Sequence, residues 1–173
     1  MSENVVKPNK LLLVSTFRHY FIGLGLALDD KDHAFHIVFI DQKFDDERNP
    51  ILQAVLDEPS PFKSVVCLPP RSTGVAKRKV RKMGFGQLRQ LIDSLSPIEI
   101  CVGNDRRIEF QYAMHYAKNI RRMNALGGYL DDGAGSYITF NTFRRRKVLT
   151  DRYIDTPIKK LSYGRWFDRP SWI

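Results

Sequence analysis

The sequence predicts an α/β protein with a Rossmann-like, mainly parallel sheet that has helices on both faces. Short apolar runs typical of buried strands alternate along the chain with longer segments whose apolar residues recur at helical spacing. The apolar runs end in small or polar residues, as strands do before a helix begins. The length of 173 residues, of which 43% are hydrophobic and 27% charged, fits one globular domain.

The first half of the chain alternates strands and helices. Strands are expected over residues 10–16, 34–40 and 64–68, because each is a short apolar run. A helix is expected over residues 17–28, interrupted by Gly23 and Gly25, and a second, opened by a proline, over 50–56.

The second half continues the alternation. A basic helix is expected over residues 75–95, where Gly84 and Gly86 are positions at which it could break. A strand over 98–102, a helix over 107–123 and a short strand over 128–130 follow. We therefore expect a polar N-terminal extension (1–9), one Rossmann-like domain (10–150) and an aromatic and basic tail (151–173).

The sequence favours a cytoplasmic protein. No apolar run approaches the roughly 20 residues of a membrane span, and residues 1–10 contain no apolar segment of a secretory signal. Cys67 and Cys101 each lie inside an expected strand. We interpret them as two reduced core thiols rather than as a disulfide or a metal-binding pair.

Positive charge is concentrated in two blocks. Residues 1–70 contain seven basic and ten acidic residues, whereas the rest of the chain contains 21 and nine. The blocks consist of Arg71, Lys77, Arg78, Lys79, Arg81, Lys82 and Arg89, and of Arg144, Arg145, Arg146 and Lys147. Such blocks attract nucleic acid, anionic lipid, or phosphorylated or sialylated saccharides, although a solvated helix face has the same composition.

Polar residues gather where the expected strands end. In a parallel sheet, ligands bind beyond the carboxyl ends of the strands. The loops at these ends are residues 15–16, 69–73, 103–107 and 131–137. We expect substrate-binding residues here: Ser15, Thr16, Asn104, Asp105 and Arg106.

Several familiar signatures are absent. Gly23 and Gly25 lack the third glycine of a dinucleotide-binding loop, and there is no phosphate-binding loop. Ser136 is not in the nucleophile elbow of a serine hydrolase. Asp30 and Asp32 have the spacing of a metal-nucleotide motif, but their acidic context favours a solvated turn. The four histidines show no metal-ligand spacing, so we expect no metal.

Asp131, Asp132 and Gly133 form the one motif with a catalytic interpretation. Two adjacent carboxylates follow an expected strand and precede glycines that allow a tight turn and close approach to a ligand. One carboxylate can face a substrate and act as general base while the other holds the loop. The alternative is a turn in which both aspartates only accept backbone hydrogen bonds.

The segment Tyr129-Leu-Asp-Asp-Gly-Ala-Gly-Ser-Tyr137 resembles the acidic motif of bacterial sialyltransferases, especially glycosyltransferase family 52 and the related capsular polysialyltransferases. The order of the preceding segments is also similar. Leu12–Thr16 resembles the opening strand of that family, and Val102–Arg106 resembles the strand and loop before the motif. The resemblance extends over about residues 10–160.

The resemblance implies an inverting, metal-independent transfer of sialic acid from CMP-sialic acid to a glycan hydroxyl. The fold implied is the N-terminal, acceptor-side half of a GT-B glycosyltransferase. Asp131 would be the base, Asp132 would orient it, and Gly133 would let the loop close on the acceptor. No cofactor besides the donor substrate is implied. The setting implied is synthesis of bacterial lipopolysaccharide or capsule, at the inner face of the membrane.

One feature departs from the family. The family holds the CMP phosphate with a His-Pro motif, but none of the four histidines here precedes a proline. We therefore expect a C-terminal donor-binding half or a partner chain to supply the donor site. The alternative function is a non-catalytic module that binds an anionic polymer through the basic blocks. Nucleic acid is the disfavoured polymer, because no recognised nucleic-acid-binding motif appears in the sequence.

Overall fold

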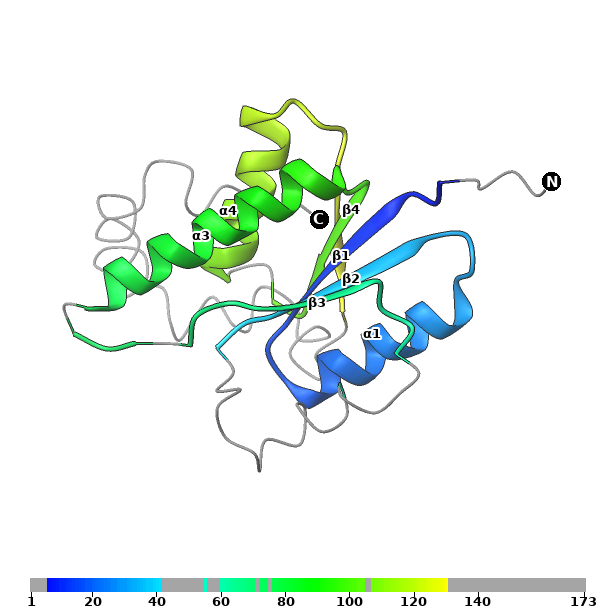
Figure 1. Ribbon diagram of the computed structural model, residues 1–173, viewed down its shortest axis with the longest axis horizontal. Coiled ribbons are helices and arrows are strands. Elements are labelled where there is room, and N and C mark those ends of the chain that lie inside the picture. The colour runs from blue at the N-terminus through cyan, green and yellow to red at the C-terminus, as the bar shows by residue number, and fades with distance from the viewer. Residues whose placement is uncertain are drawn as a thin grey trace, which may run out of the picture.

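The computed structural model describes residues 6–41, 55, 60–70, 72–74, 76–104 and 107–130. Five strands form one sheet, in the order β3-β2-β1-β4-β5 (Figure 1). All neighbouring strands are parallel. The strands are β1 (Asn9–Val14), β2 (Ala34–Phe39), β3 (Ser64–Cys67), β4 (Glu99–Val102) and β5 (Leu126–Tyr129). The predicted α/β class with a parallel sheet is confirmed.

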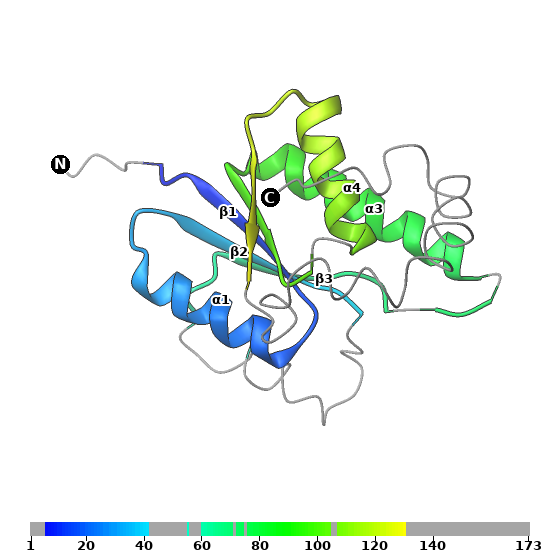
Figure 2. The ribbon, with the colours of Figure 1, turned by 180° about the vertical axis from the view of Figure 1, so that it is seen from behind.

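Helices cover both faces of this sheet. Helix α1 (Phe17–Asp29) lies on one face, and α3 (Ala76–Leu95) and α4 (Ile108–His115) lie on the other (Figures 1 and 2). Helix α4 continues into a wider π-helical turn, η1 (Tyr116–Ile120). The arrangement is a three-layer α/β/α fold, as the alternating pattern of strands and helices predicts.

The central strand β1 explains why the fold has two cores. Leu11 and Leu13 pack in the core beneath α3 and α4, whereas Leu12 and Val14 pack in the core beneath α1. Successive side chains of a strand point to opposite faces, so a strand covered on both sides is apolar at every position. All four of these residues are fully buried.

Two helices run without a break through glycines. Helix α1 is continuous through Gly23 and Gly25, so the expected interruption is wrong, and α3 is continuous through Gly84 and Gly86, where the sequence had left a break open. A glycine costs a helix only about 1 kcal/mol, which core packing outweighs. Gly23 also serves the packing, because a Cβ there would lie 2.9 Å from Leu12 Cδ1.

Other expectations differ in detail. Strand β5 begins at Leu126 and ends at Tyr129, instead of covering 128–130. Asn9, expected in the polar extension, belongs to β1. Cys67 is exposed, so only Cys101 is a core thiol, and both cysteines are free. Burial raises the pKa of the Cys101 thiol, which therefore stays protonated.

Some expectations concern residues that are not described. Within the expected helix over 50–56, only Val55 is described, and it is helical. The end of the predicted domain and the tail after residue 150 also lie outside the described residues. In the part of the chain that is described, no helix is long and apolar enough to cross a membrane.

Candidate functional site at the carboxyl edge of the sheet

The strand order defines a topological switch point, which is where sheets of this class bind ligands. Strands β1 and β4 are neighbours, but the chain leaves β1 toward β2 on one side and leaves β4 toward β5 on the other. Loops diverge at such a switch point and leave a crevice beyond the carboxyl ends of the two strands. The expected binding residues Ser15, Thr16 and Asn104 follow these two strands, so the fold brings them to one edge.

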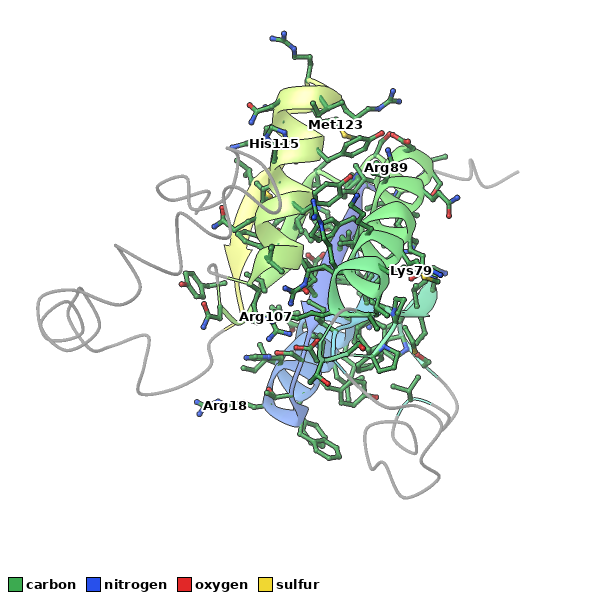
Figure 3. All side chains as sticks on the ribbon, turned by 90° about the vertical axis from the view of Figure 1, so that its left-hand side faces the viewer. Arg18, Lys79, Arg89, Arg107, His115 and Met123 are labelled. Carbon is green, nitrogen blue, oxygen red and sulfur yellow. The ribbon has the colours of Figure 1, made fainter. Side chains whose placement is uncertain are left out.

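Three helices also begin at this edge, because each runs antiparallel to the strand before it. Figure 3 shows Arg18, Lys79 and Arg107, one near the start of each helix, lying below Arg89, His115 and Met123. Helix N-termini carry partial positive charge. This edge of the sheet is therefore suited to anionic or polar ligands.

Ser15 and Thr16 form the entry to α1. Thr16 is the N-cap residue, and its Oγ1 accepts a hydrogen bond from the His19 backbone N–H at 3.3 Å. The Ser15 hydroxyl lies 3.3 Å from His19 Nδ1. Thr16 is exposed and Ser15 is half-buried. Both hydroxyls lie at the crevice, and both are held by the first turn of the helix.

His19 joins α1 to the loop after β4. Its side chain is buried, with 4% of its surface exposed. It lies directly on Gly103, where a Cβ would be 1.9 Å from His19 Nε2. Gly103 is therefore required because only a residue without a side chain leaves room for the imidazole. This contact holds the first turn of α1 against the loop after β4.

The loop after β4 carries the next predicted residues. Asn104 is exposed, and its backbone carbonyl accepts a hydrogen bond from the Arg107 N–H at 3.0 Å. The side chain of Asn104 thus lies at the edge, in a turn that leads into α4. Asp105 and Arg106 lie outside the described residues.

Strand β5 ends beside this loop. Val102 pairs with Tyr129, and the Leu130 N–H donates a hydrogen bond to the Val102 carbonyl at 2.9 Å. Leu130 is fully buried. The chain therefore leaves the sheet next to Gly103 and Asn104. The following predicted residues, Asp131, Asp132 and Gly133, lie outside the described residues.

An ion pair crosses the carboxyl end of β1. An Arg107 terminal nitrogen lies 2.6 Å from Asp41 Oδ2. Asp41 follows β2 and Arg107 follows β4, so the pair spans the strand between them. Asp41 has a φ of 60°, a left-handed conformation that aspartate tolerates better than most residues. The ion pair joins the loops on both sides of β1.

A buried carboxylate extends this pair toward α3. Glu109, 7% exposed, lies 3.7 Å from Arg107 Nε through Oε2 and 3.4 Å from Arg81 Nε through Oε1. Together with Asp41 the four residues form the Asp41–Arg107–Glu109–Arg81 network, with alternating charges. A buried carboxylate needs such partners, because transfer of an unpaired charge out of water is costly.

A cavity lies beside this network, between α3 and the carboxyl ends of β2 and β3. It is a small, partly open cavity, with a volume of about 30 Å³. Its polar lining consists of Asp41, Ser72, Lys77, Arg81 and Glu109. We refer to it as the α3 cavity.

Sequence reasoning missed the roles of His19, Asp41 and Glu109. His19 was considered only as a metal ligand, and Asp41 was assigned to a polar loop. Glu109 did carry a signal, because it is a charged residue in the first turn of an otherwise apolar helix, beside Ile108 and Phe110. The sequence did indicate the first basic block. On α3, Arg78, Lys79 and Lys82 of this block are exposed, and Lys77 and Arg81 line the α3 cavity.

Comparison with known proteins does not identify the site: no protein-family model and no curated protein matches the chain. Across the described residues there is no group of three or more His, Cys, Asp or Glu side chains that could hold a metal ion. The geometry of the carboxyl edge is therefore the basis for assigning a function.

Proposed function

We propose that this chain is the acceptor-side domain of a sialyltransferase-like glycosyltransferase. In the proposed reaction, sialic acid passes from CMP-sialic acid to a hydroxyl of a glycan in bacterial surface polysaccharide synthesis. Asp131 takes the proton of the acceptor hydroxyl, and the hydroxyl oxygen attacks the anomeric carbon of sialic acid. The bond from that carbon to the CMP phosphate oxygen breaks, and CMP leaves with the electron pair.

One observation carries this proposal. The hydrogen bond from the Leu130 N–H to the Val102 carbonyl fixes the end of β5 beside the Gly103–Asn104 turn. The acidic pair Asp131-Asp132 begins at the next residue of the sequence. A base that follows β5 would act at the crevice where Ser15, Thr16 and Asn104 can contact the acceptor.

The surrounding residues support a polar acceptor. Ser15, Thr16 and Asn104 supply hydroxyl and amide groups, which suit the hydroxyls of a sugar. Gly133, in the same proposal, gives the loop the freedom to close over the acceptor. Asp105 and Arg106 belong to the same loop as Asn104, and Arg106 suits an anionic acceptor. We propose that a C-terminal half or a partner chain holds CMP-sialic acid.

The first test is calorimetric titration of the full chain with CMP, CMP-sialic acid and a panel of acceptor glycans, followed by a transfer assay in the presence of the donor-binding half or partner. Asp131→Asn should weaken acceptor binding several-fold and reduce transfer about 10²- to 10⁴-fold. The matched control is Asp32→Asn, the same change at an exposed aspartate at the opposite edge of the sheet. Asp32→Asn should change neither quantity.

Unchanged transfer in Asp131→Asn would contradict the assignment of the base. Binding to no glycan in the panel would contradict the proposal as a whole.

A second function has its own observation. Arg78, Lys79 and Lys82 are exposed on α3 and make no ion pair within the described part of the chain. A module that binds an anionic polymer, or the anionic inner face of a membrane, would use this surface together with the second basic block, Arg144–Lys147, which lies outside the described residues. Its binding should fall steeply with salt and be indifferent to Asp131→Asn, whereas acceptor binding at the crevice should depend on Asp131.

A further inference from the structure

The α3 cavity has a lining that helix packing alone does not explain. Leu88 and Ile92 lie on the face of α3 that packs into the core, and both are fully buried. Lys77 and Arg81 lie on the same face, since they precede Leu88 by eleven and seven residues. Where the helix passes beyond the sheet, its inward face therefore changes from apolar to cationic, and both cations line the cavity.

These cations do not stabilise the helix. Lys77, Arg78 and Lys79 lie in the first turn of α3, which contains no acidic residue. Cations there are repelled by the partial positive charge of the helix N-terminus, which destabilises the helix. Lys77 and Arg81 are also four residues apart, a spacing at which like charges repel. The positive charge thus has an energetic cost in the absence of a bound anion.

The lining contains two carboxylates and two cations, and Arg107, which lies beside the cavity and pairs with both carboxylates, adds a third cation. Arg107 and Arg81 are engaged by the carboxylates of Asp41 and Glu109. Lys77, the remaining charged residue of the lining, makes no ion pair with any described residue. The Ser72 hydroxyl also lines the cavity. The ion pair with Glu109 holds the Arg81 guanidinium in place, so an anion would meet Arg81 already positioned, with Lys77 in the same lining.

We propose that the α3 cavity binds one oxyanion group of a ligand, a phosphate or a carboxylate, through Lys77, Arg81 and Ser72. Neighbouring strands are about 4.8 Å apart, so the ends of β2 and β5, three strand spacings apart in the sheet, are separated by about 14 Å. The oxyanion site, at the carboxyl ends of β2 and β3, is therefore separate from the end of β5, after which the proposed base Asp131 follows. It does not rest on the proposed transfer reaction.

The test is a titration of the ¹⁵N-labelled full chain with inorganic phosphate and, separately, with N-acetylneuraminate, at constant ionic strength. We expect saturable shifts of the amide signals around Ser72, Lys77 and Glu109 with at least one of the two. Saturation with phosphate alone identifies a phosphate site, and saturation with N-acetylneuraminate identifies a carboxylate site. Saturation with neither overturns the proposal.

Lys77→Gln is the test variant, and two further variants of α3, Lys77→Arg and Lys79→Gln, are its controls. Lys77→Gln should weaken binding about tenfold or more, because it removes a charge-assisted hydrogen bond. Lys77→Arg, which keeps the charge, should retain binding within a few-fold. Lys79→Gln makes the same charge change two residues away, on the outer side of the helix (Figure 3), and should weaken binding less than twofold.

Equal losses in Lys77→Gln and Lys79→Gln would mean a diffuse attraction and an adventitious ion only, which overturns the proposal. Thermal unfolding of each variant shows whether it is folded. Asp131→Asn should leave phosphate binding unchanged, so failure of the proposed transfer reaction and failure of this site are distinguishable.

Discussion

The two edges of the sheet differ in how their charged side chains are paired. At the amino edge, Lys10 lies 3.2 Å from Asp30 and 3.3 Å from Glu99, and His33 donates to Asp30 at 2.7 Å. At the carboxyl edge, Lys77, Arg78 and Lys79 of α3 make no ion pair with any described residue. The first edge balances its charges, whereas the second leaves a positive excess.

A second group of polar side chains at the amino edge, Asn9, His36 and Ser64, is joined by hydrogen bonds. Asn9 donates through its side-chain amide to the Leu95 carbonyl at 2.6 Å, and its Oδ1 lies 3.0 Å from His36 Nε2. His36 Nδ1 lies 2.7 Å from the Ser64 hydroxyl. Because Asn9 Oδ1 can only accept, Nε2 carries the proton and Nδ1 accepts from Ser64. A neutral His36 therefore satisfies both ring nitrogens.

The carboxyl edge contains residues whose backbone conformation, packing or burial normally lowers stability. Gly103 has no room for a Cβ, Asp41 is in a left-handed conformation, and Glu109 is a buried carboxylate. The amino edge thus pairs its polar groups within the protein, whereas the carboxyl edge contains the two binding sites that we propose. Four substitutions test this comparison, from the largest expected effect on stability to the smallest.

Gly103→Ala should have the largest effect, with a loss of about 2–3 kcal/mol in the free energy of unfolding. The new methyl would overlap the buried imidazole of His19, which has little room to move. Denaturant unfolding measures the loss. Gly86→Ala is the matched control, since no atom lies within 4 Å of a Cβ there, and it should stabilise α3 by about 0.5–1 kcal/mol.

The cause can be isolated with a double-mutant cycle. His19→Ala removes the overlapping ring, so Gly103→Ala should cost much less in a His19→Ala background. Additive losses would mean that the Gly103–His19 contact does not shape this edge.

Glu109→Gln should destabilise the protein by about 2 kcal/mol, because it leaves Arg81 and Arg107 without their shared carboxylate. Glu99→Gln makes the same change at the amino edge, where the carboxylate is 28% exposed and pairs with Lys10. Its cost should stay below about 1 kcal/mol. Chemical unfolding of both variants compares the two edges directly, and equal losses would contradict the difference between them.

The fold was predictable from the sequence because its signal is local. The apolar run Leu11–Val14 predicts a strand buried on both faces, and alternation with helices predicts a parallel sheet. It was harder to predict that the helices continue through Gly23 and Gly84. Helix propensity gives the cost of a glycine, but it does not include the core contacts that outweigh this cost.

The candidate site was only partly predictable. Ser15, Thr16 and Asn104 could be found because strand ends are visible in the sequence and the loops of a parallel sheet gather at one edge. The contact of His19 with Gly103 and the bridge from Arg107 to Asp41 join residues 84 and 66 positions apart. Such pairs depend on the strand order, which no single segment of the sequence encodes.

Asp30 should make the amino edge sensitive to strong acid. Hydrogen bonds from His33 and Lys10 lower the pKa of Asp30 to about 2 in the folded protein, from a usual value of 3.8. A lowered carboxyl pKa stabilises the folded state above the unfolded pKa, and this stabilisation is lost as the pH falls from about 4 to 2. Unfolding measured across this range should show a steeper loss in the wild type than in Asp30→Asn. Parallel curves would mean that Asp30 does not contribute.

Substitution of His36 should have the smallest effect on stability. This effect should appear near neutral pH and not in strong acid. Burial, with the nearby charge of Lys63, lowers the pKa of His36 below its usual 6.5, so the folded protein binds a proton at this residue less readily than the unfolded chain. Stability is therefore complete above about pH 6.5 and falls as the pH is lowered below that value. His36→Gln should reduce the slope of unfolding free energy against pH between 7 and 5. An unchanged slope would show that the hydrogen bonds among Asn9, His36 and Ser64 tolerate a charged imidazole. They would then not require His36 to be neutral.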